Sequence, residues 1–347
     1  MPYHLLALLL FLCASCKAQP VANDQTEAIR EVIASDQYPN IDGVVIARKG
    51  EIIFEAYFNG FHRNKLHDTR SSFKSVTSLL AGIAIDQGLF ALEDELQTFF
   101  EDWKDDPRGK ITVKDLLQMK SGLESECFLD WGPCVESDLF ESEDWLQFIL
   151  DVPLRHEPGL NWEYTSIEPQ LVGLIIAQTS GMTIMDFARQ YLFEPLEITN
   201  YEWLIDPQGR GYTAGSFNML PRDMLKIAQL VLDNGVWEGE QIVSADWIAE
   251  STTCPTDVEM SFVRFTGLQN AKYTTANYGY FWYREALQFG DIKTEALFGS
   301  GNGGQYMMVL EEYDLALAFT GSNYGNWRGK LPFVILLRHL IPMLEGF

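Results

Sequence analysis

The chain has 347 residues, of which 47% are hydrophobic and 21% charged, and its formal net charge is −24. This composition is ordinary for a globular protein, and the length fits one large domain or two closely packed lobes. The excess of carboxylates argues against nucleic-acid binding, because phosphate contacts require a surface rich in lysine and arginine. An acidic surface also keeps an exported protein soluble, which accounts for most of the charge without a special partner.

The first residues of the chain resemble an export signal. The apolar run Leu5–Ala14 is too short to span a bilayer and is typical of the centre of a secretory signal, although the usual basic start is missing. The letters CASC, which end at Cys16, resemble a bacterial lipoprotein box with cysteine where leucine is usual. We predict a signal peptide of the lipoprotein type over 1–16, lipidation at Cys16 and a tether over 17–26. Ordinary cleavage near Ala18 is the alternative, and either route predicts an exported protein of the periplasm or outer envelope.

The cysteines and histidines give no sign of a metal site. Export places Cys127, Cys134 and Cys254 in an oxidising compartment. A disulfide between Cys127 and Cys134 and a pair of free thiols both remain open, because the distance between the α-carbons decides. No cluster of His, Cys and Asp has the spacing of metal ligands, and His62 and His67 are expected at the surface. The sequence therefore predicts no metal site.

The first expected elements are a hairpin and a helix. Two β-rich runs, Val44–Arg48 and Ile52–Phe58, flank Lys49-Gly50, which is a turn signal. A polar start at Ser71 then leads into an apolar helix that stops at Gly88, a plausible C-cap.

Later elements continue the pattern, with helices in the middle of the chain and strands near its end. The stretches expected as helices are TVKDLLQMKSG, PQLVGLIIAQTSG, TIMDFARQYLF, RDMLKIAQLVLDNG and about Leu331 to Leu344, and those expected as strands are YGYFWYRE, GGQYMMVLEE and LALAFTGS. This order predicts an α/β fold of the α+β type, in which both ends of the chain build one antiparallel sheet flanked by helices. We expect a single domain over 27–345, with a sheet lobe over about 27–90 and 265–345 and a mostly helical lobe over about 91–264.

Ser71 and Lys74 are one helical turn apart, so their side chains lie on one face of the expected helix. The start of a helix favours negative charge. A serine hydroxyl is a weak nucleophile without an adjacent base, and a buried lysine within hydrogen-bonding reach can serve as that base. S-x-x-K alone is a weak signal, and a capping serine followed by a surface lysine is the structural alternative.

Two later stretches strengthen the catalytic interpretation. Tyr164-Thr165-Ser166 lies in a loop between the turn at Pro158-Gly159 and an apolar helix, a context that other copies of Y-x-[NS] in this chain lack. Gly299, Ser300 and Gly301 stand before and within an expected strand. Such small residues would let a substrate lie against the strand edge, whereas a glycine-rich hairpin turn is the alternative.

The order S-x-x-K, Y-x-[NS] and then a third motif ending in glycine resembles the signature of serine β-lactamases and penicillin-binding proteins. The similarity is greatest to the class C-like branch, with its esterases and amide hydrolases. Segments such as LLQMKSGL, PGLNWEYTS and GGQYMMV are also similar to family segments and follow in family order. The resemblance covers about residues 40 to 340 and implies the β-lactamase-like fold, with the active site between the two lobes.

The resemblance also implies roles for individual residues. Ser71 would be the nucleophile that accepts the acyl group, Lys74 the general base or its electrostatic partner, and Tyr164 the proton shuttle to the leaving group. Ser166 would hold Lys74, and the amides of Ser71 and Asn302 would form the oxyanion hole. The reaction would be acyl transfer through a covalent acyl-enzyme, without metal or cofactor. The residues expected to bind the substrate or the oxyanion are Ser166, Ser300, Gly301 and Asn302.

The third motif departs from the family pattern, because Gly299 stands where the family has lysine or histidine. In members that process β-lactams, this cation helps to bind the substrate carboxylate. The resemblance therefore implies small esters or amides as substrates. The alternatives are a β-lactamase or D-alanyl-D-alanine peptidase, which would act on β-lactams or wall peptides, and a non-catalytic receptor.

The segment Glu124–Asp144 is rich in Asp and Glu, contains no Lys or Arg, and includes Phe128, Trp131 and Phe140. In the family this region lies near the rim of the active site. We expect an acidic and aromatic rim that repels anionic substrates and accepts cationic or neutral ones. The alternative is an acidic loop that is simply solvated. The expected partner is thus a small ester, amide or peptide, with no nucleic acid and no membrane contact beyond the lipid at Cys16.

Overall fold

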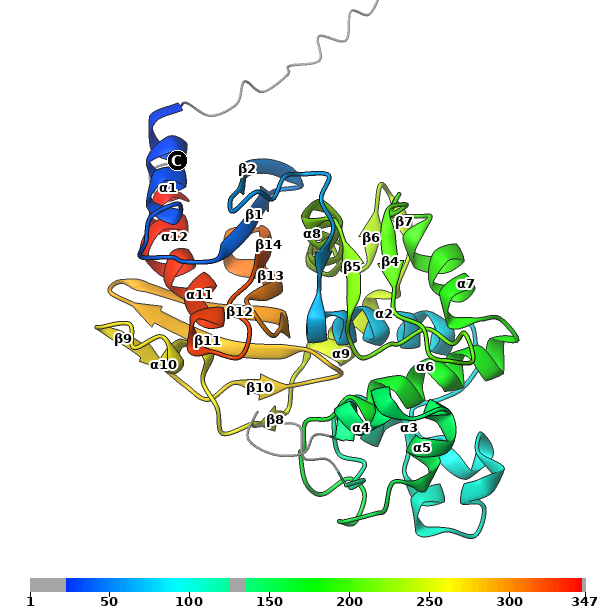
Figure 1. Ribbon diagram of the computed structural model, residues 1–347. Helices are drawn as coiled ribbons and strands as arrows, with labels where there is room; N and C mark the ends of the chain where they lie inside the picture. The colour runs from blue at the N-terminus through cyan, green and yellow to red at the C-terminus, as the bar shows by residue number, and fades with distance from the viewer. Residues whose placement is uncertain (1–22, 125–134, 345–347) are drawn as a thin grey trace, which may run out of the picture.

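The computed structural model describes residues 23–124 and 135–344, and its centre is an antiparallel sheet (Figure 1). Among these residues the sheet has nine strands in the order β2-β1-β14-β13-β12-β11-β10-β8, with β9 beside β11. Both ends of the chain contribute, which confirms the expected fold class. The strands are β1 (Ile41–Arg48), β2 (Glu51–Tyr57), β8 (Thr256–Asp257), β9 (Ala271–Tyr273), β10 (Asn277–Tyr278), β11 (Tyr283–Phe289), β12 (Ile292–Gly301), β13 (Gln305–Leu310) and β14 (Leu315–Gly321).

The predicted hairpin is present as β1 and β2. Lys49 and Gly50 form its turn with φ values of 53° and 76°, and such left-handed pairs match the twist of a two-residue hairpin. β1 lies between β2 and β14, with Val45 opposite Ala318. Almost every residue of β1 is buried, because helices cover both faces of the sheet and its central strands must be apolar on both sides.

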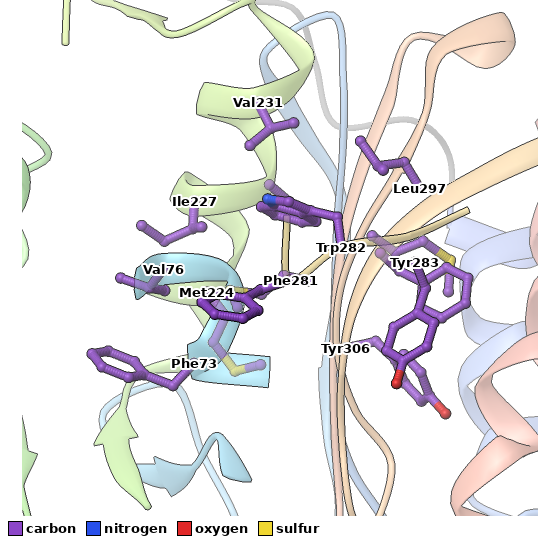
Figure 2. Close-up of a cluster of buried hydrophobic side chains, with 14 of the residues drawn as sticks. Phe73, Val76, Met224, Ile227, Val231, Phe281, Trp282, Tyr283, Leu297 and Tyr306 are labelled. Atoms are coloured by element: carbon purple, nitrogen blue, oxygen red, sulfur yellow. The ribbon is translucent and has the colours of Figure 1, made fainter. Parts of the chain in front are cut away.

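One face of the sheet is covered by α2 (Phe73–Asp86) and α8 (Pro221–Leu232), and the other by α1 (Asn23–Ile33), α11 (Leu331–Ile335) and α12 (Ile341–Leu344) (Figure 1). Figure 2 shows Met224 and Ile227 of α8 beside Phe73 of α2, while Tyr283 and Tyr306 lie on the opposite side of the sheet. The start of α1 corrects the expected tether over 17–26, since residues 23–26 are already helical.

The middle of the chain is mostly helical, as expected, but it also contains short strands and supplies α8 to the sheet. α8 packs against β13 and β14 although its sequence falls in the stretch assigned to the helical lobe. The short strands are β3 (His67–Asp68), β4 (Tyr201–Trp203) and β5 (Phe217–Met219) in one small sheet, and β6 (Val236–Trp237) and β7 (Glu240–Gln241) in a pair. The other α-helices are α3 (Val113–Leu117), α4 (Val135–Glu141), α5 (Trp145–Asp151), α6 (Ile167–Ser180), α7 (Ile184–Ala188), α9 (Ala245–Thr252) and α10 (Phe262–Phe265).

Tighter and wider helical turns connect these elements. A π-type turn, Arg189–Phe193, continues α7, and another, Leu336–Leu340, joins α11 to α12. The 3-10 turns are η1 (Arg70–Ser72), η2 (Leu96–Thr98), η3 (Glu101–Trp103), η4 (Pro107–Lys110), η6 (Glu311–Tyr313) and η7 (Trp327–Lys330). No single helix in the described ranges is long and apolar enough to cross a membrane; α6 passes only together with Ile184–Phe193, and that pair is bent by 84°.

Candidate active site

Ser71 lies in η1, the turn that leads into α2. Arg70, immediately before it, has a φ of 48°, a left-handed conformation that costs energy for a residue with a side chain. Asp68 holds this conformation, because its carboxylate accepts the Arg70 amide at 2.8 Å and pairs with the Arg70 guanidinium at 2.9 Å. Ser71 is half-buried while the next residues of α2 are buried. The turn therefore presents the Ser71 hydroxyl at the accessible end of a buried helix.

Lys74 points along α2 toward Ser71 and is only 2% exposed. Its Nζ donates to Ser71 Oγ at 3.1 Å, to Ser166 Oγ at 3.2 Å and to the Ala214 carbonyl at 2.7 Å. These bonds use all three donors of an ammonium group. Among the described residues no carboxylate forms an ion pair with Lys74. The lysine is thus fixed beside the serine hydroxyl, as a general base for that hydroxyl must be.

The Tyr164-Thr165-Ser166 motif lies at the start of α6, which packs against α2. Ser166 is the N-cap residue of α6, but its side chain makes no capping bond and instead meets Lys74. The ring centroid of Tyr164 is 4.9 Å from Lys74 Nζ. The structure therefore brings the pair Ser71 and Lys74 together with the pair Tyr164 and Ser166, although about 90 residues of chain separate the two pairs.

The third motif, Gly299-Ser300-Gly301, lies at the end of β12. It combines the two features expected from the sequence, an open strand edge and a hairpin turn that follows it. On one side β12 pairs with β13 as far as Gly301 opposite Gln305. On the other side its pairing with β11 stops at Phe298, so the edge at 299–301 has no partner from β11. Residues 302–304 then form the hairpin turn to β13. The free edge is where a substrate could lie.

Gly301 brings this strand end against the turn that carries Ser71. A Cβ at Gly301 would lie 2.3 Å from the Thr69 carbonyl oxygen, so any larger residue would push the two apart. Asn302 follows, and its side-chain oxygen accepts the Gly325 amide at 2.9 Å. Ser300 lies opposite Tyr306 in the β12–β13 ladder, so its side chain is on the face of Tyr306 rather than that of the two flanking glycines.

The structure gives a steric reason for the missing cation at Gly299. A Cβ at this position would lie 2.5 Å from Ser75 Oγ and 3.3 Å from the Ser72 carbonyl oxygen. Ser75 is itself held by a hydrogen bond of 2.7 Å to the Phe281 carbonyl. A lysine or histidine therefore does not fit at position 299 unless Ser75 moves.

Sequence reasoning missed Ala214 and Gly215, which complete the site. The Ala214 carbonyl accepts the shortest of the three Lys74 bonds, and a Cβ at Gly215 would lie 3.2 Å from the Arg70 carbonyl oxygen. A backbone carbonyl has no residue-type signature. The only signal was the run of small residues around Gly215, which fits many loops equally well.

Glu168 is a buried carboxyl in the first turn of α6, and it is 1% exposed. One oxygen accepts the Ser121 amide at 2.8 Å, whereas the other has no partner among the described residues. Burial raises the pKa of Glu168 well above its usual range, and the carboxylates of Asp115 and Glu163 act in the same direction. The Glu168 carboxyl is therefore protonated at pH values where a surface glutamate is ionised.

We expect Glu168→Gln to stabilise the fold at neutral pH. A raised folded-state pKa means that stability is fully present below the unfolded pKa, about 4.3, and is lost as the pH rises through the folded value. Glutamine keeps an oxygen that accepts the Ser121 amide, and because it does not ionise it avoids this loss of stability. Urea unfolding should show a gain for the variant at pH 8 that vanishes near pH 4. An equal gain at both pH values would contradict this account.

The described residues contain no group of three or more His, Cys, Asp and Glu side chains that could hold a metal ion. The expectation that His67 lies at the surface is wrong. His67 is buried because its Nε2 lies 3.0 Å from the buried Asp42 carboxylate. Cys254 is free and buried, and burial raises the pKa of its thiol to about 12, which leaves it unreactive. Several predictions concern residues outside the described ranges: the signal peptide over 1–16, lipidation at Cys16, the fates of Cys127 and Cys134, and the rim residues Phe128 and Trp131.

Comparison with known proteins shows the family of the chain. A 6-aminohexanoate-dimer hydrolase of Paenarthrobacter ureafaciens is 20% identical over 315 residues, which cover 85% of this chain and 77% of that protein. A lovastatin esterase of Penicillium rubens is 28% identical over 156 residues, 38% of each chain. The structure of a class C β-lactamase from Rhodobacter sphaeroides superposes with a TM-score of 0.64 at 16% identity, covering 92% of this chain and 100% of that one. The model of the family described as Beta-lactamase matches residues 28–331. With hydrolases among its relatives and that family model spanning most of its length, this chain belongs to the Beta-lactamase family.

Proposed function

We propose that the protein is a serine hydrolase that forms a covalent acyl-enzyme on Ser71 and hydrolyses small esters or amides. The observation that carries this proposal is the contact of 3.1 Å between Lys74 Nζ and Ser71 Oγ in a site where Lys74 is buried. A buried amine beside a serine hydroxyl is an arrangement that activates the serine for attack on a carbonyl. The names of the two curated relatives, a hydrolase and an esterase, support the same class of reaction.

The chemistry follows from the positions of these groups. Lys74 takes the proton of Ser71 as Oγ attacks the carbonyl carbon, and the amides of Ser71 and Asn302 stabilise the oxyanion that forms. Tyr164, beside Lys74, passes the proton to the leaving alcohol or amine as the carbon–oxygen or carbon–nitrogen bond breaks. A water molecule then attacks the acyl group, and the proton returns to Ser71 Oγ.

Small esters and amides are favoured over β-lactams because of the third motif. The packing of Gly299 against Ser75 excludes the lysine or histidine that would bind a carboxylate. A β-lactamase or D-alanyl-D-alanine peptidase remains the alternative, and comparing turnover of simple esters with that of cephalosporins and D-alanyl-D-alanine peptides separates the two. A non-catalytic receptor would show no turnover of any of these substrates.

The test is hydrolysis of p-nitrophenyl butyrate by the purified protein and by Ser71→Ala. We expect turnover by the wild type and a loss of at least ~10³-fold in the variant, together with an acyl adduct on Ser71 by intact mass. Equal turnover by both proteins would show that Ser71 is not the nucleophile. Absence of both turnover and adduct would exclude a simple-ester hydrolase and favour the receptor.

We also infer that the acidic rim selects against anionic substrates. Its described part contributes the carboxylates Glu136, Asp138, Glu141, Glu143 and Asp144, of which only Asp144 pairs with a cation, Arg210, at 2.7 Å. Replacing Asp138, Glu141 and Glu143 with amides should raise kcat/KM for an anionic ester severalfold relative to a cationic one of the same acyl group. An unchanged ratio would mean that this segment is merely solvated.

Export and anchoring remain part of the proposal, since the sequence alone supports them. The letters CASC suggest that the mature chain begins at a lipidated Cys16. We expect the mass of the N-terminal peptide from a bacterial membrane fraction to include a diacylglyceryl group, and Cys16→Ser to abolish it. A peptide that starts near Ala18 without lipid would establish ordinary cleavage.

A further inference from the structure

A buried carboxylate, Asp42 on β1, joins two segments that carry parts of the candidate site. Asp42 is 1% exposed and interrupts the register between β1 and β14. An irregularity of this kind re-aims a side chain relative to a regular strand. The Oδ2 atom of Asp42 lies 3.0 Å from His67 Nε2 and also accepts the Ser322 hydroxyl. His67 comes shortly before Ser71 in the chain, and Ser322 follows directly after β14.

The first arm of this bridge runs through His67 to the turn that carries Ser71. His67 Nδ1 faces the Asp68 carbonyl oxygen at 3.2 Å, and the Asp68 carboxylate accepts the Arg70 amide at 2.8 Å. Because Arg70 has a left-handed φ of 48°, its conformation persists only while the surrounding contacts hold it. The backbone angles of Arg70 orient the next peptide group, so they set the direction of the Ser71 N–H.

The second arm runs through Ser322 to the turn that carries Asn302. Ser322 begins the loop after β14, and two amides of this loop hold the turn that follows β12. The Asn323 amide donates to the Gly303 carbonyl at 3.0 Å. The Gly325 amide donates to the side-chain oxygen of Asn302 at 2.9 Å. The position of this loop therefore determines where the Asn302 backbone lies.

The bridge joins two segments that otherwise meet only by close packing around Gly301. His67 belongs to the small sheet, where it pairs with Met219, whereas Asp42 belongs to the large sheet. A Cβ at Gly301 would lie 2.3 Å from the Thr69 carbonyl oxygen. This packing limits how near the strand end and the turn can come, but it does not draw them together. The Asp42 carboxylate supplies that attraction, because it binds a group from each segment.

We propose that Asp42 and His67 are positioning residues that set the spacing and direction of the Ser71 and Asn302 amides. These amides are the oxyanion donors of the proposed reaction, and such donors must point to where the negative charge develops. Asp42 and His67 are both buried, so they act through the segments that they join. The inference rests on the proposed function, since it concerns the oxyanion hole of that reaction.

The test compares two amide substitutions of His67 in the full chain. In His67→Gln the amide nitrogen takes about the place of Nε2, so it can still donate to Asp42. In His67→Asn the side chain is one methylene shorter, and its amide can reach the Asp68 carbonyl but not Asp42. We expect His67→Asn to lower kcat for p-nitrophenyl butyrate about 30-fold with KM changed less than about twofold. His67→Gln should lose less than about threefold.

A transition-state analogue separates positioning from a general loss of structure. With phenylboronic acid, Ser71 Oγ adds to boron, the serine proton passes to Lys74, and an oxygen of the tetrahedral boronate enters the oxyanion hole. The inhibition constant should rise in His67→Asn by the factor of about 30 by which kcat/KM falls. A variant that is merely part-unfolded would lose kcat without any change in the inhibition constant, and urea unfolding measures its folded fraction.

Ser322→Ala tests the second arm and removes only one hydroxyl. We expect a smaller loss of kcat, about fivefold, because the Ser322 amide also donates to the Asn40 carbonyl at 2.9 Å and keeps part of the link. Ser180→Ala is the matched control. It removes another half-buried serine hydroxyl, which donates to the Ile176 carbonyl at 2.6 Å within α6, and it should leave kcat unchanged.

Each other result overturns the inference. Equal losses in His67→Gln and His67→Asn would mean that the contact with Asp42 is not what matters. An unchanged inhibition constant in His67→Asn, or a loss in Ser180→Ala as large as that in Ser322→Ala, would leave these residues a structural role alone. If His67→Asn does not fold, Ser322→Ala decides by the same two constants. Absence of turnover by the wild type would overturn the proposed function itself, and this inference with it.

Discussion

Replacing Lys74 with methionine is expected to lower kcat/KM for p-nitrophenyl butyrate by at least ~10³-fold while the chain still folds. Methionine has nearly the length of lysine and suits a position that is 2% exposed. It cannot accept the Ser71 proton, so the hydroxyl loses the base that lies 3.1 Å away. The Ala214 carbonyl loses its donor, and we expect a loss of stability of about 1–3 kcal/mol for that unsatisfied group.

Two further variants make this prediction specific. Lys114→Met removes a half-buried lysine that pairs with Glu93, and it should keep full activity. Because Ser71 and Lys74 act as one unit, the double variant of Ser71→Ala and Lys74→Met should be no slower than either single variant. Activity of Lys74→Met within tenfold of the wild type would show that another group takes the proton.

Replacing Gly82 with alanine is expected to destabilise the protein by about 3 kcal/mol, the opposite of what helix propensity suggests. Alanine in the middle of a helix is ordinarily better than glycine by about 1 kcal/mol. At Gly82, however, the added Cβ would lie 2.2 Å from the indole of Trp247. Trp247 is 4% exposed, and its indole N–H donates to the Ser78 carbonyl at 3.0 Å. α9 would have to move away from α2, the helix that carries Lys74.

A double-mutant cycle separates the steric clash from a general effect on the helix. The cost of Gly82→Ala should fall close to zero, or become a gain, in the background of Trp247→Ala, because the two side chains would no longer overlap. Urea unfolding of the four proteins measures this coupling. A cost that is the same in both backgrounds would exclude the clash with Trp247 as its cause.

The parts of the fold that the sequence predicted are those with a local signal. The Lys49-Gly50 hairpin has turn residues between two β-rich runs, and α2 has apolar residues at helical spacing before Gly88. The candidate catalytic side chains could be named from the sequence because S-x-x-K and Y-x-[NS] are contiguous patterns. Burial of Lys74 could only be suggested, since a lysine after a capping serine is more often at the surface.

What the sequence did not predict depends on contacts between distant segments. The Ala214 carbonyl bonds to Lys74 across 140 residues of chain, and a backbone oxygen leaves no pattern. His67 was expected at the surface because its neighbours are polar, but Asp42 on β1 draws it into the interior. The sequence shows that the family's lysine or histidine is missing at position 299. The physical reason, the packing of Gly299 against Ser75, is visible only in the structure.

The position of β1 between β2 and β14 has a consequence for how the chain folds. Ile41, near the start of the chain, pairs with Gly321, near its end. Such long-range pairing is slow to form, and β1 lacks one of its neighbours until the final strand has been synthesised. The edge of β12 that meets the Ser71 turn is likewise late in the chain. The Ser71 turn is therefore synthesised early, whereas the strand end that packs against it is synthesised late, so a growing chain cannot complete the candidate site until β12 has been made.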